Sequence, residues 1–497
     1  MNNGHSSISR HLFPRLNTPA FLLNEAYRDD TLGLVEQGVG GFVLFEGSVD
    51  DCAETISLLR GEASHQLLFA ADCEFGLTMR FRGGIAYPSM MGLGEGNDLS
   101  LTEEVARAIA MEMAAIGLDW NFAPVLDVNS NPANPIINIR SFGESPHIVA
   151  EHGAAYIRGM QSGGIIACGK HFPGHGDTTV DSHIDLPSLE RSREGLERLE
   201  LLPFRRAVDE GVLSIMSGHI ALPSLDSGRL PASLSPSILK FLREHLHFDG
   251  VIVTDALDMG AIVRTHGAEE GVVQAFIAGN DVLEIPRDPW EAIRALSAAV
   301  EDGRITVELL EESGRRLEKL VQWSEAKGSK SLRVEGESAI SVRFDPIHHV
   351  ELAVQATRQA LRVSGERAAL PKEKLPVLLL SDGSEEEINS IEDILLRLDY
   401  PLLGHVTGER NSMANNGVGL PEYLLLVASI RPRGGAGSVG FEGEQKQILS
   451  QIKSGNTILL NLGNPYLLTD RTFAFRVDTF STSELSLMEG LLRIDQV

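Results

Sequence analysis

The segment from Lys170 to Pro187, KHFPGHGDTTVDSHIDLP, concentrates side chains that can bind metal ions or move protons. It holds one lysine, three histidines and three aspartates. It directly follows the apolar run Ile165–Gly169, which predicts a strand. Ionisable groups at the end of a buried strand are costly unless they are paired or take part in chemistry. This segment is therefore the first candidate for a functional site.

Two kinds of chemistry fit this segment. In the first, a metal ion is bound by His171, His175, Asp181 and His183. Pro173 argues against a helical site, because proline disrupts the turn that would place the first two histidines side by side, and this leaves a metal site in a loop as the form to consider. In the second, Asp181 and His183 form a proton-transfer pair, since residues two apart in an extended loop project to the same side. The carboxylate would orient the imidazole and raise its proton affinity. A structural loop of hydrogen-bonded histidines is the third interpretation.

Other ionisable residues also stand at the ends of predicted strands. Asp255 directly follows the buried run Val251–Val253, where its carboxylate would point into the mouth of a barrel. The alternative is that Asp255 caps the next helix. Taken singly, the remaining candidates are equally typical of salt bridges or caps: Asp72, Glu74, Asp127, Arg140 and His219.

The elements that must position these residues are short apolar runs that alternate with longer amphipathic stretches up to about residue 325. The runs lack strict two-residue alternation, which is typical of parallel strands buried on both faces. Alternation sustained over roughly 300 residues favours a (β/α)8 TIM-type barrel, whose active face lies at the strand C-termini. Pro19–Asn24 is the candidate for the eighth strand, and the alternative is that one strand of the barrel is degenerate. The other seven are Gly41–Phe45, Leu67–Ala71, Asp119–Val125, Ile165–Phe172, Val212–His219, Gly250–Ala256 and Asp281–Pro286.

The composition changes after Leu320. Residues 324–338 are polar and charged without clear periodicity, which is typical of a linker. Beyond them, a helix-like segment and three apolar runs predict a smaller α/β sandwich domain. These are Val350–Leu361, Pro376–Leu380, Tyr423–Ile430 and Thr457–Leu462. We therefore expect a barrel at residues 1–323, a linker at 324–340 and a second α/β domain at 341–497.

The charge balance and the cysteines limit the partners. The 497 residues include 43 Lys and Arg against 69 Asp and Glu, giving a net charge of -26 that would repel nucleic acids and anionic membranes. Three widely spaced cysteines indicate neither a disulfide framework nor a zinc knuckle.

Met1–Asn17 lacks the apolar core of a secretory signal, and no apolar run is long enough to cross a membrane, so we expect a cytoplasmic protein. Arg431–Gly440 is glycine-rich but lacks the ending of a phosphate-binding loop, and no cofactor is expected.

Taken together, these motifs resemble one known family. KHFPGHGDTTVDSH, at Lys170–His183, is similar to the signature K-H-F-P-G-H-G-x4-D-S-H of family 3 glycoside hydrolases of the β-N-acetylglucosaminidase branch. GVIVTDALDM, at Gly250–Met259, resembles the nucleophile segment of that family. FAPVLDVN (Phe122–Asn129) and NPIINIRSFG (Asn134–Gly143) resemble two further segments in the expected order. The similarity spans about residues 15–320 and continues weakly through the second domain.

The resemblance implies a retaining hydrolysis of terminal, non-reducing β-linked N-acetylglucosamine, from cell-wall muropeptides or chitooligosaccharides. In this branch Asp255 would be the nucleophile, His183 the acid and base, and Asp181 the residue that orients His183. An imidazole suits both roles because it titrates near neutral pH. The residues that match sugar-holding positions of the family are Asp72, Arg80, Arg140, Lys170 and His171. The carbohydrate would be the partner, and no metal is implied.

One departure from the family pattern concerns the rim of the pocket. Family members commonly read D-x-E-G-G-x-x-x-R-F, whereas this chain has Phe75 in place of the first glycine. The rival functions are a β-N-acetylglucosaminide phosphorylase, because a histidine acid would not repel phosphate, and a β-glucosidase or xylosidase of the same family. More remote rivals are a metal-dependent hydrolase and an inactive carbohydrate-binding protein.

Overall fold

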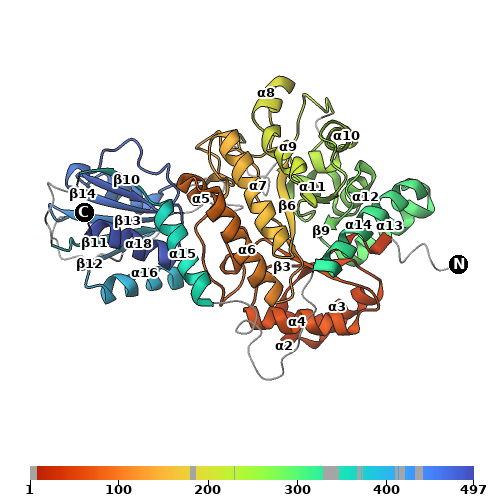
Figure 1. Cartoon of the computed structure of the whole chain (residues 1–497), viewed down its shortest axis with the longest axis horizontal. Coiled ribbons are helices and arrows are strands. Elements are labelled where there is room, and N and C mark those ends of the chain that lie inside the picture. The colour runs from red at the N-terminus through yellow and green to blue at the C-terminus, as the bar shows by residue number, and fades with distance from the viewer. Residues whose placement is uncertain are drawn as a thin grey trace.

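A computed structural model of the chain describes residues 8–178, 186–228, 230–327, 346–366, 371, 373–408, 412, 420–430 and 440–496. Figure 1 shows two parts side by side: a large α/β barrel built from the first two thirds of the chain, and a smaller α/β sandwich at the C-terminus. The predicted fold class is therefore confirmed.

The barrel is a curled sheet in which all neighbouring strands are parallel. Its order is β2 (Arg15–Leu16), β3 (Gly41–Leu44), β4 (Leu68–Ala71), β5 (Trp120–Asn121), β6 (Ile166–Phe172), β7 (Ser214–Ser217) and β8 (Val251–Thr254). β1 (Leu12–Phe13), separated from β2 by Pro14, pairs with β9 (Leu283–Glu284). A bridge between Val253 and Val282 links β8 to the segment that enters β9. The first strand is thus split into two halves, and together with β9 it closes the barrel.

Side chains of the strands are buried on both faces, as the continuous apolar runs predict. In β4, Leu68 and Ala70 belong to the cluster inside the barrel, which also contains Trp120. Phe69 and Ala71 of the same strand pack in the layer beneath the surrounding helices. The two-residue period of a strand therefore divides one apolar run between two cores.

The helices of the barrel surround this sheet (Figure 1). They are α2 (Thr18–Leu23), α3 (Glu25–Glu36), α4 (Val49–Glu62), α5 (Met90–Gly96), α6 (Leu99–Ala115), α7 (Pro146–Ser162), α8 (Arg193–Arg198), α9 (Leu201–Asp209), α10 (Pro236–His245), α11 (Gly260–His266), α12 (Ala268–Ala278), α13 (Pro289–Glu301) and α14 (Val307–Lys327). In the described loops of the barrel lie three short 3₁₀ helices: η1 (Leu77–Met79), η2 (Asn138–Arg140) and η3 (Ala232–Leu234). None of the helices in the described ranges is both long and apolar enough to span a membrane.

The prediction of a strand at Pro19–Asn24 is wrong, because this segment forms α2. Asn17 caps the helix by accepting a hydrogen bond from the Ala20 amide at 2.7 Å, and Pro19 fits the first turn, where its missing N–H costs nothing. Leu23 is 87% exposed, so the apolar run does not mark a buried strand. The eighth strand is instead the pair of two-residue segments just before this helix.

The second domain is a six-stranded sheet with the order β10-β15-β14-β13-β11-β12. Its strands are β10 (Arg362–Gly365), β11 (Val377–Ser381), β12 (Leu402–Val406), β13 (Leu424–Ile430), β14 (Thr457–Gly463) and β15 (Phe475–Asp478). Among the described strands of this sheet, β10 alone runs antiparallel to its neighbour. Apolar clusters cover the sheet on both faces, and the helices are α15 (Pro346–Ala360), α16 (Glu385–Arg397), α17 (Gly443–Leu449) and α18 (Glu484–Asp495). The three predicted apolar runs correspond to β11, β13 and β14.

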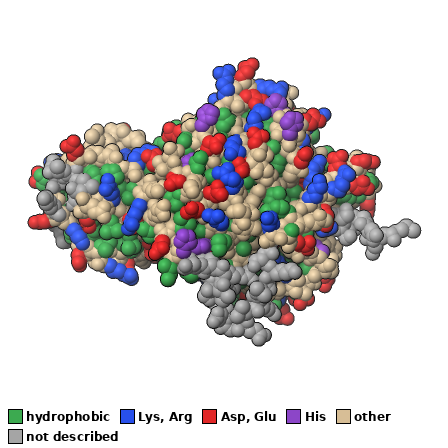
Figure 2. Space-filling view, viewed as in Figure 1, with side chains coloured by type: hydrophobic (Ala, Val, Ile, Leu, Met, Phe, Trp, Pro, Cys, Tyr) green, Lys and Arg blue, Asp and Glu red, His purple; other side chains and the backbone are tan. Residues whose placement is uncertain are grey.

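The two parts meet along α15, which packs against α5 and α6 of the barrel. Behind this contact, the Tyr87 hydroxyl donates to Glu112 Oε1 at 2.7 Å, and His349 Nδ1 lies 3.0 Å from the same oxygen. Closer to the surface, Arg362 Nη2 pairs with Glu95 Oε2 at 2.6 Å. Figure 2 shows acidic and basic side chains intermingled over one face of both parts. Buried polar bonds and a surface ion pair therefore fix the second domain against the barrel.

Candidate active site

The carboxyl ends of parallel strands meet at one rim of a barrel, and several predicted site residues stand there. Asp72 and Glu74 follow β4, Lys170 and His171 lie on the last part of β6, and Asp255 follows β8. These residues come from three strands that are far apart in the sequence, and the curled sheet brings their ends to one rim.

Lys170 is the centre of a buried ionic cluster. Its Nζ lies 2.6 Å from Asp72 Oδ1 and 2.8 Å from Glu74 Oε1, and the residue is 1% exposed. Burial alone would lower the pKa of Lys170, but the charges of Asp72 and Glu74 outweigh it and raise the pKa. The lysine is therefore a fixed cation inside the site.

Two arginines hold the other sides of the same carboxylates. Arg80 Nη2 lies 2.6 Å from Asp72 Oδ2. Arg140, which ends η2, binds Glu74 through two nitrogens, with Nη2–Oε1 at 2.6 Å and Nε–Oε2 at 3.0 Å. Burial opposes ionisation of Glu74, yet Arg140 and then Lys170 lower its pKa to about 2. The pKa of Asp72 is likewise held below its usual range, since Lys170 and Arg80 outweigh the effect of burial.

Arg80 keeps one donor available. Its guanidinium lies over the ring of Phe45, 4.8 Å from the centroid. Its Nε is buried and has no hydrogen-bond partner within the described part of the chain. A buried N–H without an acceptor is costly, and a ligand oxygen would satisfy it.

Asp127 connects the histidines of the candidate segment. It is fully buried, and its Oδ2 lies 2.7 Å from His171 Nδ1. Its Oδ1 accepts the backbone amide of His175 at 2.6 Å. Burial would raise the pKa of Asp127, but His171 and these hydrogen bonds keep it below its ordinary range. With Nδ1–H directed at the carboxylate, His171 Nε2 is the nitrogen left to face other groups.

His175 has a structural position. Its Nδ1 lies 2.5 Å from Thr178 Oγ1, and burial lowers its pKa to about 4, so the ring is neutral at physiological pH. Both Nδ1 atoms of the predicted histidine pair are thus engaged by protein oxygens. Within the described ranges, no group of three His, Cys, Asp or Glu side chains has the arrangement of a metal site.

Asp181 and His183, the predicted proton-transfer pair, lie outside the described residues.

Asp255 lies directly at the end of β8. Its backbone amide donates to Ser217 O at 3.0 Å, and its Oδ1 accepts the amide of Ala256 at 2.8 Å. The alternative prediction that Asp255 caps the next helix is wrong, because α11 begins at Gly260 with Met259 at its N-cap. His219 fixes the adjacent backbone, with its Nε2 2.9 Å from Ala256 O.

Glu284 lies beside the candidate site, and the sequence analysis did not single it out. It lies on β9, is 3% exposed, and its Oε2 is buried with no hydrogen-bond partner among the described residues. Burial raises its pKa well above the ordinary range, and the negative charges of Asp255 and Asp72 add to this effect. Burial and the field of Asp255 therefore both favour the protonated form of this carboxyl. The sequence feature that could have indicated Glu284 is its position as an acidic residue within the apolar run Asp281–Pro286.

The second domain contacts the barrel loop that carries Arg140. Asn129 Nδ2 donates to the Tyr466 hydroxyl at 2.9 Å, and Asn138 Nδ2 donates to Asn464 Oδ1 at 3.3 Å. Asn138 immediately precedes Ile139 and Arg140 in η2. The sandwich domain therefore supports one wall of the candidate site through this loop.

The chain matches a known family over most of the barrel. The family model described as Glycosyl hydrolase family 3 N terminal domain covers residues 18–320. A beta-N-acetylglucosaminidase/beta-glucosidase of Cellulomonas fimi is 30% identical over 499 residues, covering 93% of this chain and 87% of that protein. Beta-hexosaminidase A of Pseudoalteromonas piscicida is 35% identical over 317 residues, 57% of this chain; the chain spans about half (53%) of that relative's length.

Solved structures agree with this match. A glycoside hydrolase family 3 beta-N-acetylglucosaminidase from Paenibacillus sp. str. FPU-7 has a TM-score of 0.86 at 28% identity, covering 100% of this chain and 97% of that one. A beta-glucoside phosphorylase has a TM-score of 0.85 at 19% identity, covering 99% of this chain and 92% of its own. The second likeness concerns the fold alone.

Proposed function

Because the chain belongs to glycosyl hydrolase family 3, we propose that it is a retaining exo-β-N-acetylglucosaminidase. Its substrates are oligosaccharides with a terminal, non-reducing β-linked N-acetylglucosamine, from cell-wall muropeptides or chitooligosaccharides. The observation that carries the proposal is the buried cluster around Lys170, held rigidly on the same barrel rim as Asp255. The names of relatives that cover most of the chain support the choice of sugar.

In the proposed reaction, a carboxylate oxygen of Asp255 attacks the anomeric carbon. The bond from that carbon to the leaving oxygen breaks, and His183 gives its proton to this oxygen. Water then attacks the glycosyl-aspartate while His183 takes up a proton, so the configuration is retained overall. Asp181 orients the imidazole and stabilises its charged form.

The ionic cluster is proposed to hold the sugar. Lys170, Arg80 and Arg140 carry three positive charges against the two carboxylates of Asp72 and Glu74, which leaves one positive charge in excess. Donors held by fixed ion pairs can bind hydroxyl and acetamido oxygens without first being ordered. His171, oriented by Asp127, is a further donor or acceptor for a hydroxyl.

The proposed domain division is a catalytic barrel at residues 1–323, a linker at 324–340 and a sandwich domain at 341–497. Its support is that α14 ends at Lys327 and α15 begins at Pro346.

The proposed location is the cytoplasm. Its support is that Cys52, Cys73 and Cys168 are all free and buried thiols, which is typical of proteins in reducing compartments.

The test compares release of p-nitrophenol from the β-N-acetylglucosaminide and from the β-glucoside in phosphate-free buffer. We expect a clear preference for the acetamido sugar. Asp255→Asn should lower kcat by about a thousandfold or more. Asp258→Asn, which removes a nearby exposed carboxylate three residues on, is the matched control and should retain activity. Release from the glucoside alone, or turnover that requires added phosphate and yields a sugar 1-phosphate, would contradict the proposal.

A further inference from the structure

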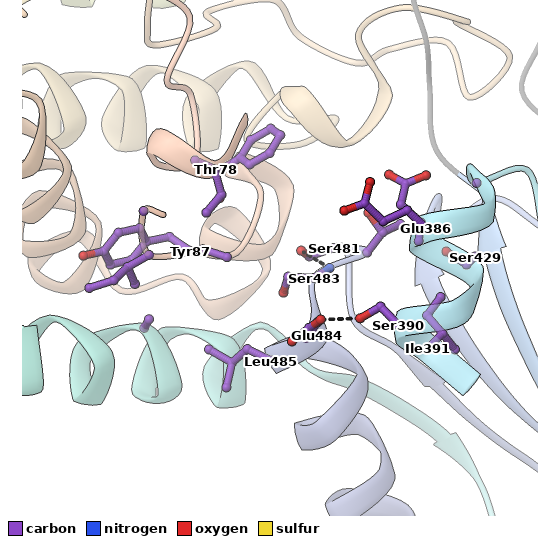
Figure 3. A pocket seen from close by; sticks show the side chains of 18 of the residues that line it. Thr78, Tyr87, Glu386, Ser390, Ile391, Ser429, Ser481, Ser483, Glu484 and Leu485 are labelled. Atoms are coloured by element: carbon purple, nitrogen blue, oxygen red, sulfur yellow. Dashed lines mark hydrogen bonds between the residues drawn. The ribbon is translucent and has the colours of Figure 1, made fainter. Parts of the chain in front are cut away.

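A pocket of about 690 Å³ lies between the barrel and the sandwich domain (Figure 3). On the barrel side it is lined by the loop that follows Glu74, including Phe75 and Tyr87. On the other side it is lined by the start of α16, the end of β13 and the residues that lead into α18. Its volume is within the range of small-molecule sites. Its lining contains none of the residues gathered around Lys170.

The pocket lies at the switch point of the second sheet. The chain passes from β11 to β12 on one side and then to β13 on the other side of β11. Asp382, just after β11, and Ser429, near the end of β13, both line the pocket. The crevice outside the carboxyl ends of the strands at a switch point is where open α/β sheets bind ligands.

The chemistry of the walls is acidic and hydroxylated. The described lining residues include Asp382, Glu386, Glu387 and Glu484 together with several serines, and they include no lysine or arginine. Glu387 accepts the backbone amide of Ser384, and Glu484 accepts the hydroxyl of Ser390 (Figure 3). Glu386 makes no hydrogen bond or ion pair with other described residues and remains exposed. Among the described lining residues, Glu386 is therefore a carboxylate that can pair with a cation in the pocket.

The two helix N-termini at the pocket are already capped. The first turn of α16 is closed by a capping box, in which Ser384 Oγ accepts the Glu387 amide. In α18, Ser483 Oγ accepts the amide of Ser486. Acidic residues already occupy both first turns. The partial positive charge of each terminus is thus satisfied within the protein.

Ser429 gives an independent sign of a ligand. The residue is only 6% exposed and lines the pocket (Figure 3), yet no donor or acceptor of the described residues hydrogen-bonds to its hydroxyl. Its Oγ is not fully buried, so it is accessible from the pocket. A ligand hydroxyl or amine in the pocket would satisfy Ser429.

We propose that this interdomain pocket is a second saccharide site, which binds an amino sugar carrying a free, protonated amine. The amine pairs with Glu386, a sugar hydroxyl bonds to Ser429, and an apolar sugar face lies against Phe75. Phe75 is the residue that replaces a glycine of the family pattern, so this chain has an aromatic wall where the pattern has none. The choice of a saccharide rests on the proposed function of the barrel, whereas the preference for a cation rests on the pocket alone.

The test is calorimetric titration of the full-length Asp255→Asn protein, so that no ligand is cleaved. The ligands are the β-1,4-linked trimer of glucosamine and its fully N-acetylated counterpart, in mildly acidic buffer that keeps the amines protonated. Excess N-acetylglucosamine is present to occupy the barrel. We expect the amine trimer to bind more tightly than the acetylated one, with an affinity that falls as salt is added.

Variants locate the binding. Added to Asp255→Asn, Glu386→Gln should weaken binding of the amine trimer by about tenfold, which is the loss of one charged hydrogen bond. Ser429→Ala should also weaken it, and because its hydroxyl bonds to no described residue, the thermal stability of this variant should be unchanged. Glu385→Gln, which removes a neighbouring charge outside the pocket, is the matched control.

The proposal is overturned if the amine trimer does not bind, if Glu386→Gln and Glu385→Gln bind it equally, or if the acetylated trimer binds as tightly. A failure of the proposed function is distinguishable, since it would appear as absent hydrolysis by the unmodified protein and not as lost binding in these variants.

Discussion

The ion pairs of Glu74 should stabilise the barrel by an amount that depends on pH. Burial opposes ionisation of this carboxyl, but Arg140 and Lys170 lower its pKa from 4.5 to about 2. A difference of one unit between the folded and the unfolded pKa corresponds to about 1.4 kcal/mol of stability. The ionised carboxylate of Glu74 therefore contributes about 3 kcal/mol to the free energy of unfolding at neutral pH. A carboxyl with a lowered pKa stabilises the folded state above its unfolded pKa, and this contribution disappears as the pH falls toward the folded pKa.

Glu74→Gln keeps the shape of the side chain and removes its charge. The variant should therefore be less stable than the original chain by about 3 kcal/mol at pH 7 and by only about 1.5 kcal/mol at pH 3. Urea unfolding followed by tryptophan fluorescence measures this difference for the barrel alone, because Trp120, Trp290 and Trp323 all lie within it.

Glu62→Gln is the matched control, because Glu62 is exposed at the end of α4. It should unfold like the original chain at every pH. The reasoning is refuted if Glu74→Gln unfolds at the same urea concentration as the original chain at pH 7, or if its deficit is the same at pH 7 and pH 3.

Three further predictions concern the proposed acid His183, the buried carboxyl of Glu284 and metal ions. His183→Ala should slow hydrolysis of oligosaccharides by about a hundredfold or more but spare aryl glycosides, whose good leaving groups need little protonation; equal losses in kcat/KM would contradict its role as the acid. Glu284→Gln should be more stable than the original chain at pH 7, and the difference should become smaller toward pH 4. The pKa of Glu284 is raised in the folded state, so the stability of the original chain falls as the pH rises above the pKa of this group in the unfolded state. Urea unfolding at the two pH values tests this prediction. Dialysis against EDTA should leave hydrolysis unchanged, because His171 and His175 are hydrogen-bonded to Asp127 and Thr178; loss of activity restored by zinc would favour the metal-dependent rival.

The strand ends were predictable from the sequence because long parallel strands leave continuous apolar runs. Lys170, Asp72 and Asp255 were found in this way, each directly after or within such a run. The pairing between them was not, since Asp72 and Lys170 are 98 residues apart and no local pattern records a contact at that distance.

Short or interrupted elements escaped prediction for a different reason. The first strand consists of two residues on each side of Pro14, which is too little for any period to appear. In the second domain, β12 is only partly buried at the sheet edge, so its residues do not form a clear apolar run. Glu284 was hidden because its burial depends on its tertiary surroundings and not on its neighbours in sequence.

The closure of the barrel has a consequence for how the protein is made. β1 pairs with β9, so that Leu12 lies opposite Leu283, and His11 Nδ1 is 2.7 Å from Asp281 O. At about 5–20 residues per second, a ribosome needs roughly 15–50 s to produce the partner strand after the first one has emerged. Throughout that interval the nascent chain carries an open sheet with unpaired edges at both ends. These edges therefore need protection during translation, by a chaperone or by transient contacts along the chain.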